Sequence, residues 1–375
     1  MIRSQDPLGR FLFVGTGGKH IYVYKLEDLD HPESHTLIQA IPSEVPSFVT
    51  LHPSKRFLYA CNELETAPTG SVSAFSVDAE SGRLTWISTV PTKAPGPCHA
   101  QVHPSGEFLG SANYHGVSST IFAIDPKSGA LSPTDIVVHT YTGKGPHPDR
   151  QECSHPHQFH WNADGSLAYV ADLGLDRIHI HPFSPESHHR RAASAAAATA
   201  AGHTQDSVVD LAVDAIPAHA PGSGPRVMAF HPASDWVYLI TELDSHIHAY
   251  SIDPSSNGWT LIQSLPLSAS NQIGASGIEV SADGRYVFAS MRADENTLSV
   301  FRIDPDTGLL TQTCRTSTLG EIPRHFALVD DRWLVVANQI SKEIRVFRFD
   351  RDSETLVSVG AIENVPECPQ SIAFL

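Results

Sequence analysis

Short hydrophobic runs of β-strand-forming residues recur along the whole chain, and alternating hydrophobic and polar stretches flank them. Each run follows a polar turn and ends in a polar tip, and most neighbouring runs are about 50 residues apart, which indicates an internal repeat. The seven segments of this kind are DPLGRFLFVGTG (6–17), HPSKRFLYACNE (52–63), HPSGEFLGSANY (103–114), NADGSLAYVADL (162–173), HPASDWVYLITE (231–242), SADGRYVFASMR (281–292) and DDRWLVVANQ (330–339). Short apolar runs rich in Val, Phe, Tyr and Ile and bounded by turns predict a β-strand in each of them.

Further strands flank each of these segments. A short alternating stretch such as SFVTLHP or CHAQVHP comes before it, and runs such as TIFAIDPKSGAL and LSVFRIDPDTGLL come after it. The acidic D-x-x-(S/T)-G turn inside those later runs predicts a hairpin and therefore a fourth strand. Four-stranded sheets that repeat radially form a β-propeller.

The two ends of the chain complement each other. The last residues, CPQSIAFL, match the first strand of the repeat, whereas the first segment matches the second strand and lacks a first. Pairing the two ends would complete one blade and remove the exposed sheet edges of a linear array. We therefore predict an all-β, seven-bladed β-propeller with four-stranded blades, one of them closed by both terminal strands, as a single domain over residues 1–375. Two stacked β-sandwiches would leave the complementary ends unexplained.

One insertion interrupts the period at residues 184–206. Its sequence, SPESHHRRAASAAAATAAGHTQD, is rich in Ala and low in complexity. Such composition predicts a disordered loop or a short surface helix and no functional element.

The charge balance narrows the possible ligands. The chain has 25 Lys and Arg against 41 Asp and Glu, a formal net charge of −16. Such an acidic protein is poorly suited to nucleic acid or to an anionic membrane surface, so an anionic ligand would need a local cluster of Arg or His.

Targeting and redox signals are few. The start, MIRSQDPLGR, has no apolar signal-peptide region, and the chain has no long apolar run, so we expect a cytoplasmic protein without a membrane span, as a monomer or weak dimer. The five cysteines are scattered and form no C-x-x-C pair, which argues against a disulfide framework or a thiolate zinc site.

The propeller register brings two sets of residues to one end of the central channel. The first strand of each blade lines the channel and runs antiparallel to the second, so the start of the first strand meets the end of the second. The first-strand set comprises Ser47, Cys98, His157, Arg226, Ser276, Arg324 and Gln370. The second-strand set comprises Gly17, Glu63, Tyr114, Leu173, Glu242, Arg292 and Gln339.

Reactive and charged side chains are concentrated in these two sets, and we expect His157, Glu242, Arg226 and Arg292 to be catalytic. His157 could act as base or acid, and Glu242 could orient it, balance the arginines or position water. The arginines, together with Arg324, could hold a carboxylate or phosphate. Convergent polar groups at a channel mouth form the default binding pocket. The alternative is that Arg and Glu only pair across blades.

Other residues near the mouth are expected to contact the substrate. His99 and His325 lie one position inside the first-strand set, and Arg150 lies in a Gly- and Pro-rich segment (139–153) that could be a lid or an ordinary loop. The full substrate-binding set comprises Arg324, His325, His155, Arg150, Glu63, His99 and Tyr114.

Two other groups of histidines receive different interpretations. His52, His103 and His231 recur because the His-Pro turn recurs, and we interpret them as structural. His155 and His157 are spaced for a metal pair but no acidic ligand recurs beside them, so we expect no metal and no cofactor.

At these residues the chain resembles the lactonases of seven-bladed propeller fold, a family that includes propeller-type 6-phosphogluconolactonases and 3-carboxy-cis,cis-muconate lactonizing enzymes. The matching stretches include GPCHAQVHPSGEFLGSANYHG, GPHPDRQECSHPHQFHWNADGSLAYVADLGLDRI, GPRVMAFHP, TEL, SMR and IPRHFAL. The resemblance implies a metal-independent site with His at the position of His157, Arg at Arg226, Glu at Glu242 and Arg at Arg292.

The pattern is closer to the phosphogluconolactonase-like branch of that family. This chain has Thr241 where the family usually has Asn, and Val227 where it often has His. We therefore expect hydrolysis of a small anionic sugar-type lactone, with small anionic lactones or carboxylates as ligands.

The alternatives are a carboxymuconate-type cycloisomerase, a non-enzymatic propeller that binds a partner protein, and a metal-dependent gluconolactonase. The charged mouth and the lack of a GH…WD repeat argue against the binding module.

Overall fold

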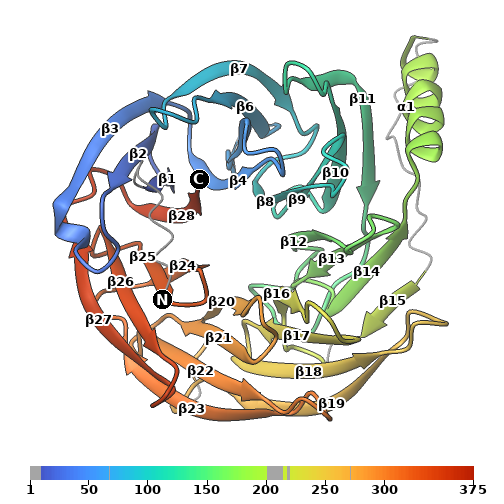
Figure 1. The fold of residues 1–375 in the computed structure, drawn as a ribbon. Coiled ribbons are helices and arrows are strands. Elements are labelled where there is room, and N and C mark those ends of the chain that lie inside the picture. The colour runs from blue at the N-terminus through green and yellow to red at the C-terminus, as the bar shows by residue number, and fades with distance from the viewer. Residues whose placement is uncertain (1–9, 67, 201–213, 218–219, 271) are drawn as a thin grey trace.

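Seven four-stranded antiparallel sheets surround a central axis in the computed structural model (Figure 1). The structure describes residues 10–66, 68–200, 214–217, 220–270 and 272–375. The seven-bladed β-propeller with four-stranded blades, predicted from the repeat, is confirmed.

The strands follow one order in each blade, from the axis outward. The innermost strands are β4 (Pro46–Leu51), β8 (Pro97–Val102), β12 (Pro156–Trp161), β16 (Pro225–Phe230), β20 (Ala275–Val280), β24 (Pro323–Val329) and β28 (Pro369–Phe374). The second strands are β1 (Arg10–Thr16), β5 (Phe57–Asn62), β9 (Phe108–Asn113), β13 (Leu167–Asp172), β17 (Trp236–Thr241), β21 (Tyr286–Met291) and β25 (Trp333–Asn338).

The outer half of each blade completes the sheet. The third strands are β2 (His20–Leu26), β6 (Ser71–Val77), β10 (Ser118–Ile124), β14 (Arg177–Pro182), β18 (His246–Ile252), β22 (Thr297–Ile303) and β26 (Glu343–Asp350). The outermost strands are β3 (His35–Pro42), β7 (Leu84–Pro91), β11 (Leu131–Thr140), β15 (Asp214–Pro217), β19 (Trp259–Pro266), β23 (Leu310–Ser317) and β27 (Thr355–Ile362). A single 3₁₀ turn, η1 (Pro32–Ser34), precedes β3.

The ends of the chain close the ring, as predicted. Strand β28 pairs antiparallel with β1, from Leu12 opposite Phe374 to Thr16 opposite Pro369, so this blade has the order β28-β1-β2-β3. The N–H of Val49 in the next blade donates to Oγ of Ser371 at 3.0 Å. Closure thus gives β1 a paired neighbour on both sides.

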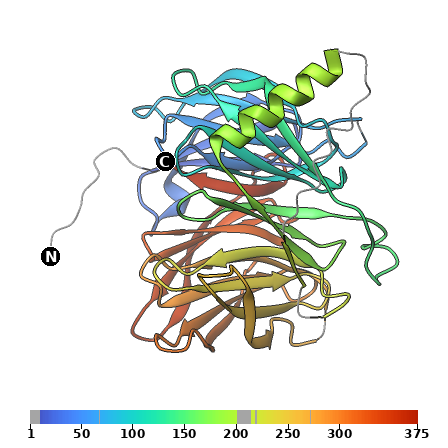
Figure 2. The ribbon, with the colours of Figure 1, turned by 90° about the vertical axis from the view of Figure 1, so that its right-hand side faces the viewer.

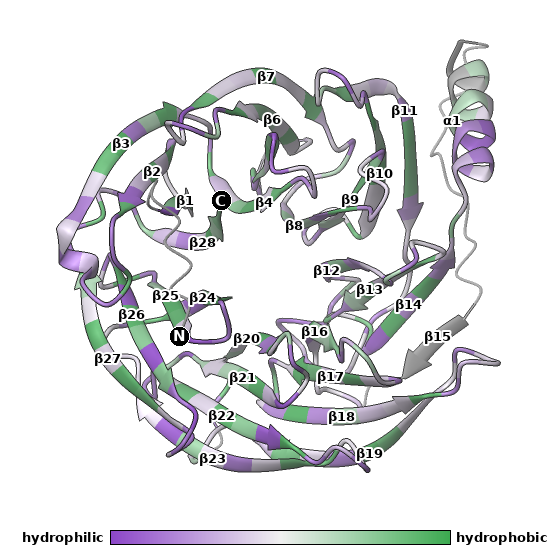
Figure 3. Ribbon diagram, in the orientation of Figure 1, coloured by the Kyte–Doolittle hydropathy of each residue, from purple (hydrophilic) through white to green (hydrophobic). Residues whose placement is uncertain are grey.

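The hydrophobic core is divided among the faces between blades. Strands β5, β9 and β21 are buried along their whole length, and hydrophobic and hydrophilic stretches are mixed along the strands of each blade (Figure 3). Among the described residues there are seven buried clusters, one between each pair of neighbouring blades. Because each sheet covers its neighbours on both faces, its second strand is nearly all apolar and does not alternate.

The histidines of the His-Pro turns connect neighbouring blades. Nε2–H of His103 donates to the carbonyl of Gly165 at 3.0 Å, and His52 and His231 make the same bond to glycine carbonyls one blade further on, at 2.9 Å in each case. Gly165 has φ of 75°, and a Cβ there would lie 2.0 Å from Nε2 of His103. The turn therefore needs glycine for its backbone conformation and for space.

The acidic turns between third and fourth strands are hairpins, as predicted. Oδ1 of Asp125 accepts the N–H groups of Lys127 and Ser128 at 3.0 and 2.7 Å. Asp304 makes the equivalent bonds at 3.1 and 2.9 Å. The carboxylate replaces the backbone partners that a tight turn lacks.

The Ala-rich insertion forms helix α1 (Pro185–Ala200), which lies outside the ring and packs against β11 (Figure 2). A short surface helix was one of the two structures expected there. Residues 201–206 of the insertion and 6–9 of the first repeat segment lie outside the described residues. No helix in the described ranges is long and apolar enough to cross a bilayer.

Candidate active site

Each innermost strand carries a β-bulge near its start, on the side of the channel mouth. At that point one residue, or two in β20, is left out of the pairing with the second strand. The residues left out are Ser47, Cys98, His157, Arg226, Ser276 with Gly277, Arg324 and Gln370. These bulge positions contain the whole first-strand set predicted from the repeat, and a bulge re-aims the side chain that it carries.

The second-strand set occupies equivalent positions as well. The N–H of Glu242 donates to the carbonyl of Gly224, two residues before Arg226, at 2.7 Å. The amides of the other six members make the same bond, each to the carbonyl two residues before the bulge of its own blade. Both predicted sets therefore lie at one end of the channel.

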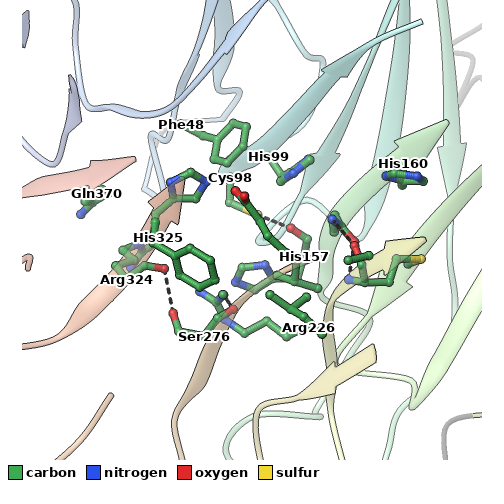
Figure 4. A pocket seen from close by; sticks show the side chains of 18 of the residues that line it. Phe48, Cys98, His99, His157, His160, Arg226, Ser276, Arg324, His325 and Gln370 are labelled. Carbon is green, nitrogen blue, oxygen red and sulfur yellow. Dashed lines mark hydrogen bonds between the residues drawn. The ribbon is translucent and has the colours of Figure 1, made fainter. Parts of the chain in front are cut away.

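A cavity of about 400 Å³ lies along the inner strands and reaches this end of the channel (Figure 4). All seven residues of the first-strand set line it. Deeper layers follow the same strands inward, first with Phe48, His99 and His325 and then with His160 and Glu279.

Glu242 is the centre of the ionic network at the mouth. Its Oε2 accepts Nε–H of Arg226 at 2.7 Å and lies 2.9 Å from NH2 of Arg292, while its Oε1 accepts from Arg150 at 2.8 Å. Glu242 and Arg226 are each only 4% exposed. Three arginines from different parts of the chain are thus held by one buried carboxylate.

The ionisation of Glu242 follows from this arrangement. Burial alone would raise the pKa of its carboxyl, but Arg292 and Arg226 outweigh burial and hold that pKa well below its usual value. An ionised carboxylate with both oxygens bonded to arginine is a poor proton acceptor. The geometry suits it to positioning the arginines.

His157 lines the same cavity. Its Nδ1 is buried and finds no hydrogen-bond partner among the described residues. Burial, reinforced by Arg226, holds the pKa of the imidazole well below its usual value, so the ring is neutral near pH ~7.

Three further buried atoms of cavity residues lack a partner in the described part of the chain, Oγ of Ser47, Nδ1 of His99 and Oε1 of Gln370. Native proteins leave few buried polar atoms unpaired, so their concentration here indicates a place for a polar ligand.

Bonds between neighbouring blades fix the ring of bulge residues. Sγ of Cys98 donates to the carbonyl of His157 at 3.4 Å, and Oγ of Ser276 donates to the carbonyl of Arg324 at 2.8 Å. A guanidinium N–H of Arg226 donates to the carbonyl of Ser276. Each side chain thus reaches the next blade along the chain, which ties the mouth together.

The mouth is positive although the protein is acidic. Arg324 lines the cavity and has Glu63 at 3.7 Å as its carboxylate neighbour. With Arg150, Arg226 and Arg292 against Glu242, the arginines at the mouth exceed the glutamates by two. This local excess is the cluster that an anionic ligand would need in a protein of net charge −16.

The structure separates the expected substrate-contacting residues into two groups. Arg324, His99 and His325 line the cavity, and the ring of Phe48 lies 4.3 Å from that of His99 and 5.6 Å from that of His325. Burial lowers the pKa of His99 to about 3 and that of His325 to about 4.

The remaining candidates lie outside the cavity lining. Arg150 does reach the mouth, where it bonds both Glu242 and the hydroxyl of Tyr114 at 3.1 Å. His155 is buried beneath Tyr114, with the two rings stacked at 4.5 Å. Glu63 contacts Arg324 as described.

The deepest polar residues of the cavity, His160 and Glu279, were not among the predicted site residues. The His160 ring stacks on that of Phe230 at 4.7 Å, and Oε2 of Glu279 accepts the N–H of Leu328 at 2.9 Å. Burial raises the pKa of Glu279 to about 8. The sequence signal for these two residues was a polar side chain three positions after His157 and after Ser276. Only the bulge turns that position toward the channel.

Comparisons with known proteins agree with the fold. A family model described as "Lactonase, 7-bladed beta-propeller" matches residues 11–372. The 6-phosphogluconolactonase of Bacillus subtilis is 28% identical over 371 residues, 97% of each chain. That of Formosa agariphila is 28% identical over 323 residues, 86% of this chain and 84% of the relative.

One solved structure resembles this chain in both fold and sequence. The periplasmic gluconolactonase of Pseudomonas aeruginosa superposes with a TM-score of 0.83 at 28% identity, over 98% of this chain and 99% of that one.

Proposed function

Because the chain belongs to the family of seven-bladed β-propeller lactonases, we propose that it hydrolyses a small anionic sugar-type lactone, with 6-phosphogluconolactone as the leading candidate. The observation that carries this proposal is the arrangement at the mouth, where Arg226, held by Glu242, lines the same cavity of about 400 Å³ as the neutral ring of His157. Two relatives that match this chain over most of their length are named 6-phosphogluconolactonase, which supports this choice of substrate.

Substrate binding would use the positive excess at the mouth. Arg324 lines the cavity and is only loosely paired with Glu63 at 3.7 Å, so its guanidinium is available to a phosphate or carboxylate. Arginine recognises such groups through two parallel hydrogen bonds. Arg324 is therefore the proposed anchor for the charged end of the substrate.

Hydrolysis of a lactone requires water to attack the ring carbonyl, and His157 is the proposed base. Its imidazole is neutral and lines the cavity, so a water molecule bound to the ring could give up its proton as it attacks. The same imidazole, once protonated, can return the proton to the leaving alkoxide oxygen. The ring bond that breaks is then the C–O ester bond, and the products are a carboxylate and an alcohol.

Arg226 is the proposed stabiliser of the oxyanion that forms on the carbonyl oxygen. Of the two arginines bound to Oε2 of Glu242, it is the one that lines the cavity. Glu242 fixes its Nε and the carbonyl of Ser276 fixes Nη1, so the guanidinium is positioned before substrate arrives. A preorganised donor of this kind is worth about 3–4 kcal/mol to the reaction.

Arg292 and Glu242 are proposed as positioning residues. Arg292 bonds the carbonyl of Gly274 at 3.2 Å as well as Glu242, and it does not line the cavity. Glu242 holds both arginines and Arg150. Their effect on the rate would then arise through the placement of Arg226.

A panel of three compounds tests the proposal. Purified protein is given 6-phosphogluconolactone, glucono-δ-lactone and 3-carboxy-cis,cis-muconate, with acid release and absorbance followed. We expect hydrolysis of both lactones, with the phosphorylated one preferred, and no cyclisation of the muconate. Lactone hydrolysis no faster than in buffer would contradict the proposal, and cyclisation alone would establish the cycloisomerase alternative.

Arg324→Ala identifies the anchor within the same panel. Loss of a charged hydrogen bond worth about 1.5–3 kcal/mol should raise KM for the phosphorylated lactone about 10–100-fold. KM for glucono-δ-lactone, which has no phosphate, should change little. An equal rise for both lactones would place the phosphate elsewhere.

A further inference from the structure

Three side chains of different metal-binding types converge in the segment that leads into β12. Glu152 Oε1 lies 3.0 Å from Nε2 of His155, Sγ of Cys153 lies 3.7 Å from the same Nε2, and Sγ lies 4.0 Å from Oε1. The sequence pattern E-C-x-H lacks a C-x-x-C pair and for that reason did not predict a metal site.

These separations are close to those of ligands around one zinc ion. Zinc binds thiolate sulfur at about 2.3 Å and imidazole nitrogen or carboxylate oxygen at about 2.0–2.2 Å, and tetrahedral angles then put such ligand atoms about 3.3–3.6 Å apart. The three measured separations lie on either side of this range. Small movements of the Glu152 side chain, which is exposed, would bring all three into it.

The hydrogen bonding of His155 directs its other nitrogen at this cluster. Its Nδ1 lies 3.0 Å from the carbonyl oxygen of Tyr114, which can only accept, so Nδ1 carries the hydrogen. The ring therefore directs Nε2 at a carboxylate oxygen and a sulfur, and a cation between the three atoms would contact all of them.

A backbone carbonyl on the far nitrogen is also the usual support of a metal-binding histidine, because it fixes the tautomer and the ring orientation. The ring is further fixed by stacking on Tyr114.

The backbone that carries the cluster is held in place by buried Asp172. Its Oδ2 accepts from Oγ of Ser154 at 2.6 Å and its Oδ1 accepts the N–H of His155 at 2.8 Å. A Cβ on Gly174 would lie 1.9 Å from the carbonyl oxygen of Cys153, so the backbone at Cys153 packs directly against the backbone at Gly174. Only Glu152 would need to move for a metal to bind.

We propose that Glu152, Cys153 and His155 bind a divalent transition-metal ion, with zinc as the best match and water as the fourth ligand. A set of sulfur, nitrogen and oxygen ligands suits zinc better than calcium or magnesium, which prefer oxygen alone. Cys153 is partly exposed and Glu152 exposed, so an ion can enter from solvent.

The site lies beside the channel mouth and shares a residue with it. Tyr114 stacks on His155 and its hydroxyl accepts from Arg150, which in turn bonds Glu242. A bound ion would therefore brace the segment that carries Arg150. It takes no part in the proposed hydrolysis, and the two proposals are tested by separate measurements.

Cobalt is a spectroscopic probe for this site. Untagged full-length protein is titrated with Co²⁺, and thiolate-to-cobalt charge-transfer absorption in the near ultraviolet is recorded, followed by displacement with Zn²⁺. We expect the band in the wild type and in Cys314→Ser, whose cysteine is also partly exposed, and its loss in Cys153→Ser. No band in the wild type, or an unchanged band in Cys153→Ser, would overturn the proposal.

Cobalt bound elsewhere on the described part of the protein can be told apart from cobalt bound to Cys153. Asp135, His188 and His189 also converge, but they contain no sulfur and give no thiolate band. Glu152→Gln, a surface change, covers the case in which Cys153→Ser fails to fold. Because loss of an outer partner alone weakens metal binding about 10–100-fold, we expect Glu152→Gln to weaken Zn²⁺ binding at least tenfold and keep the band. Unchanged affinity would also overturn the site as drawn.

Discussion

Glu242 combines a structural with a functional task. It is buried, it is ionised, and it balances Arg150, Arg226 and Arg292 through contacts of 2.7 to 2.9 Å. In a site that gathers arginines for an anionic substrate, the repulsion between their charges has to be offset before the substrate binds. One central carboxylate does this and also fixes the direction of each guanidinium.

Neutralising Glu242 should therefore destabilise the protein strongly. Removing one partner of a buried ion pair costs about 3–5 kcal/mol because the other charge is left uncompensated. We expect Glu242→Gln to lower the free energy of unfolding by about 3 kcal/mol, measured by urea denaturation. Glu63→Gln is the matched control, and with Arg324 at 3.7 Å it should cost about 1 kcal/mol or less. A loss of stability in Glu242→Gln as small as the one expected for the control would show that the Glu242 network contributes little to stability.

Glu279 should make stability depend on pH on the alkaline side. Burial raises its pKa to about 8, so the folded protein keeps a proton that the unfolded chain loses above pH ~4.3. The contribution of this proton is complete below that value and disappears as pH rises through about 8. Glu279→Gln removes the effect, so the variant should gain about 1–3 °C in Tm over the wild type between pH ~5 and pH ~9. A constant difference in Tm would contradict the buried acid.

The channel histidines act in the opposite direction. Burial lowers the pKa of His99, His160 and His325 to between about 3 and about 4. The unfolded chain binds protons at these side chains below pH ~6.5, where the folded protein does not. Stability is therefore expected to fall as pH drops from about 6.5 towards 4.

The bulge at the start of each inner strand is the element that makes the site. A regular strand alternates its side chains, so two residues in succession cannot both face the channel. The bulge skips one residue, and His157 and Gln158 both line the cavity as a result. The repeated sequence allowed the seven bulge positions to be identified by alignment of the blades.

The deeper layers could not be predicted in that way. Simple alternation from His157 leads to Phe159, which is buried between blades, whereas the channel-facing residue is His160. The same holds for Glu279 in β20, where two residues are skipped. Prediction of these residues would have required the position of the bulge, which alternation along one strand does not report.

Closure by β28 is expected to stabilise the whole ring. Ile372 in this strand is 3% exposed and packs between the first and last blades. Ile372→Asp buries an unpaired charge there and should cost at least about 3 kcal/mol, measured as the urea midpoint. Val357→Asp on an outermost strand, at a position 46% exposed, should change stability by less than about 0.5 kcal/mol. Similar effects at both positions would show that closure of the ring contributes little.

At the scale of the whole molecule, the circular array explains how distant residues share one site. His157, Arg226, Glu242 and Arg292 come from three successive blades and meet at one end of the channel because every blade presents the same two positions there. The repeat made this arrangement predictable, and complementary termini made the closure predictable. Balancing the arginines was one of the roles expected for Glu242, but the direct bond from Arg150 was not predicted, since the repeat does not place the connecting segment that carries Arg150.

The most direct test of this account is the kcat/KM of His157→Ala for 6-phosphogluconolactone, compared with the wild type and with His31→Ala. His31 is an exposed histidine remote from the mouth, paired only with Glu33, and its replacement should leave the rate unchanged. Loss of the proposed base should lower kcat/KM about 10²–10⁴-fold while the protein stays folded. A folded His157→Ala protein that opens the lactone as fast as the wild type would contradict the account.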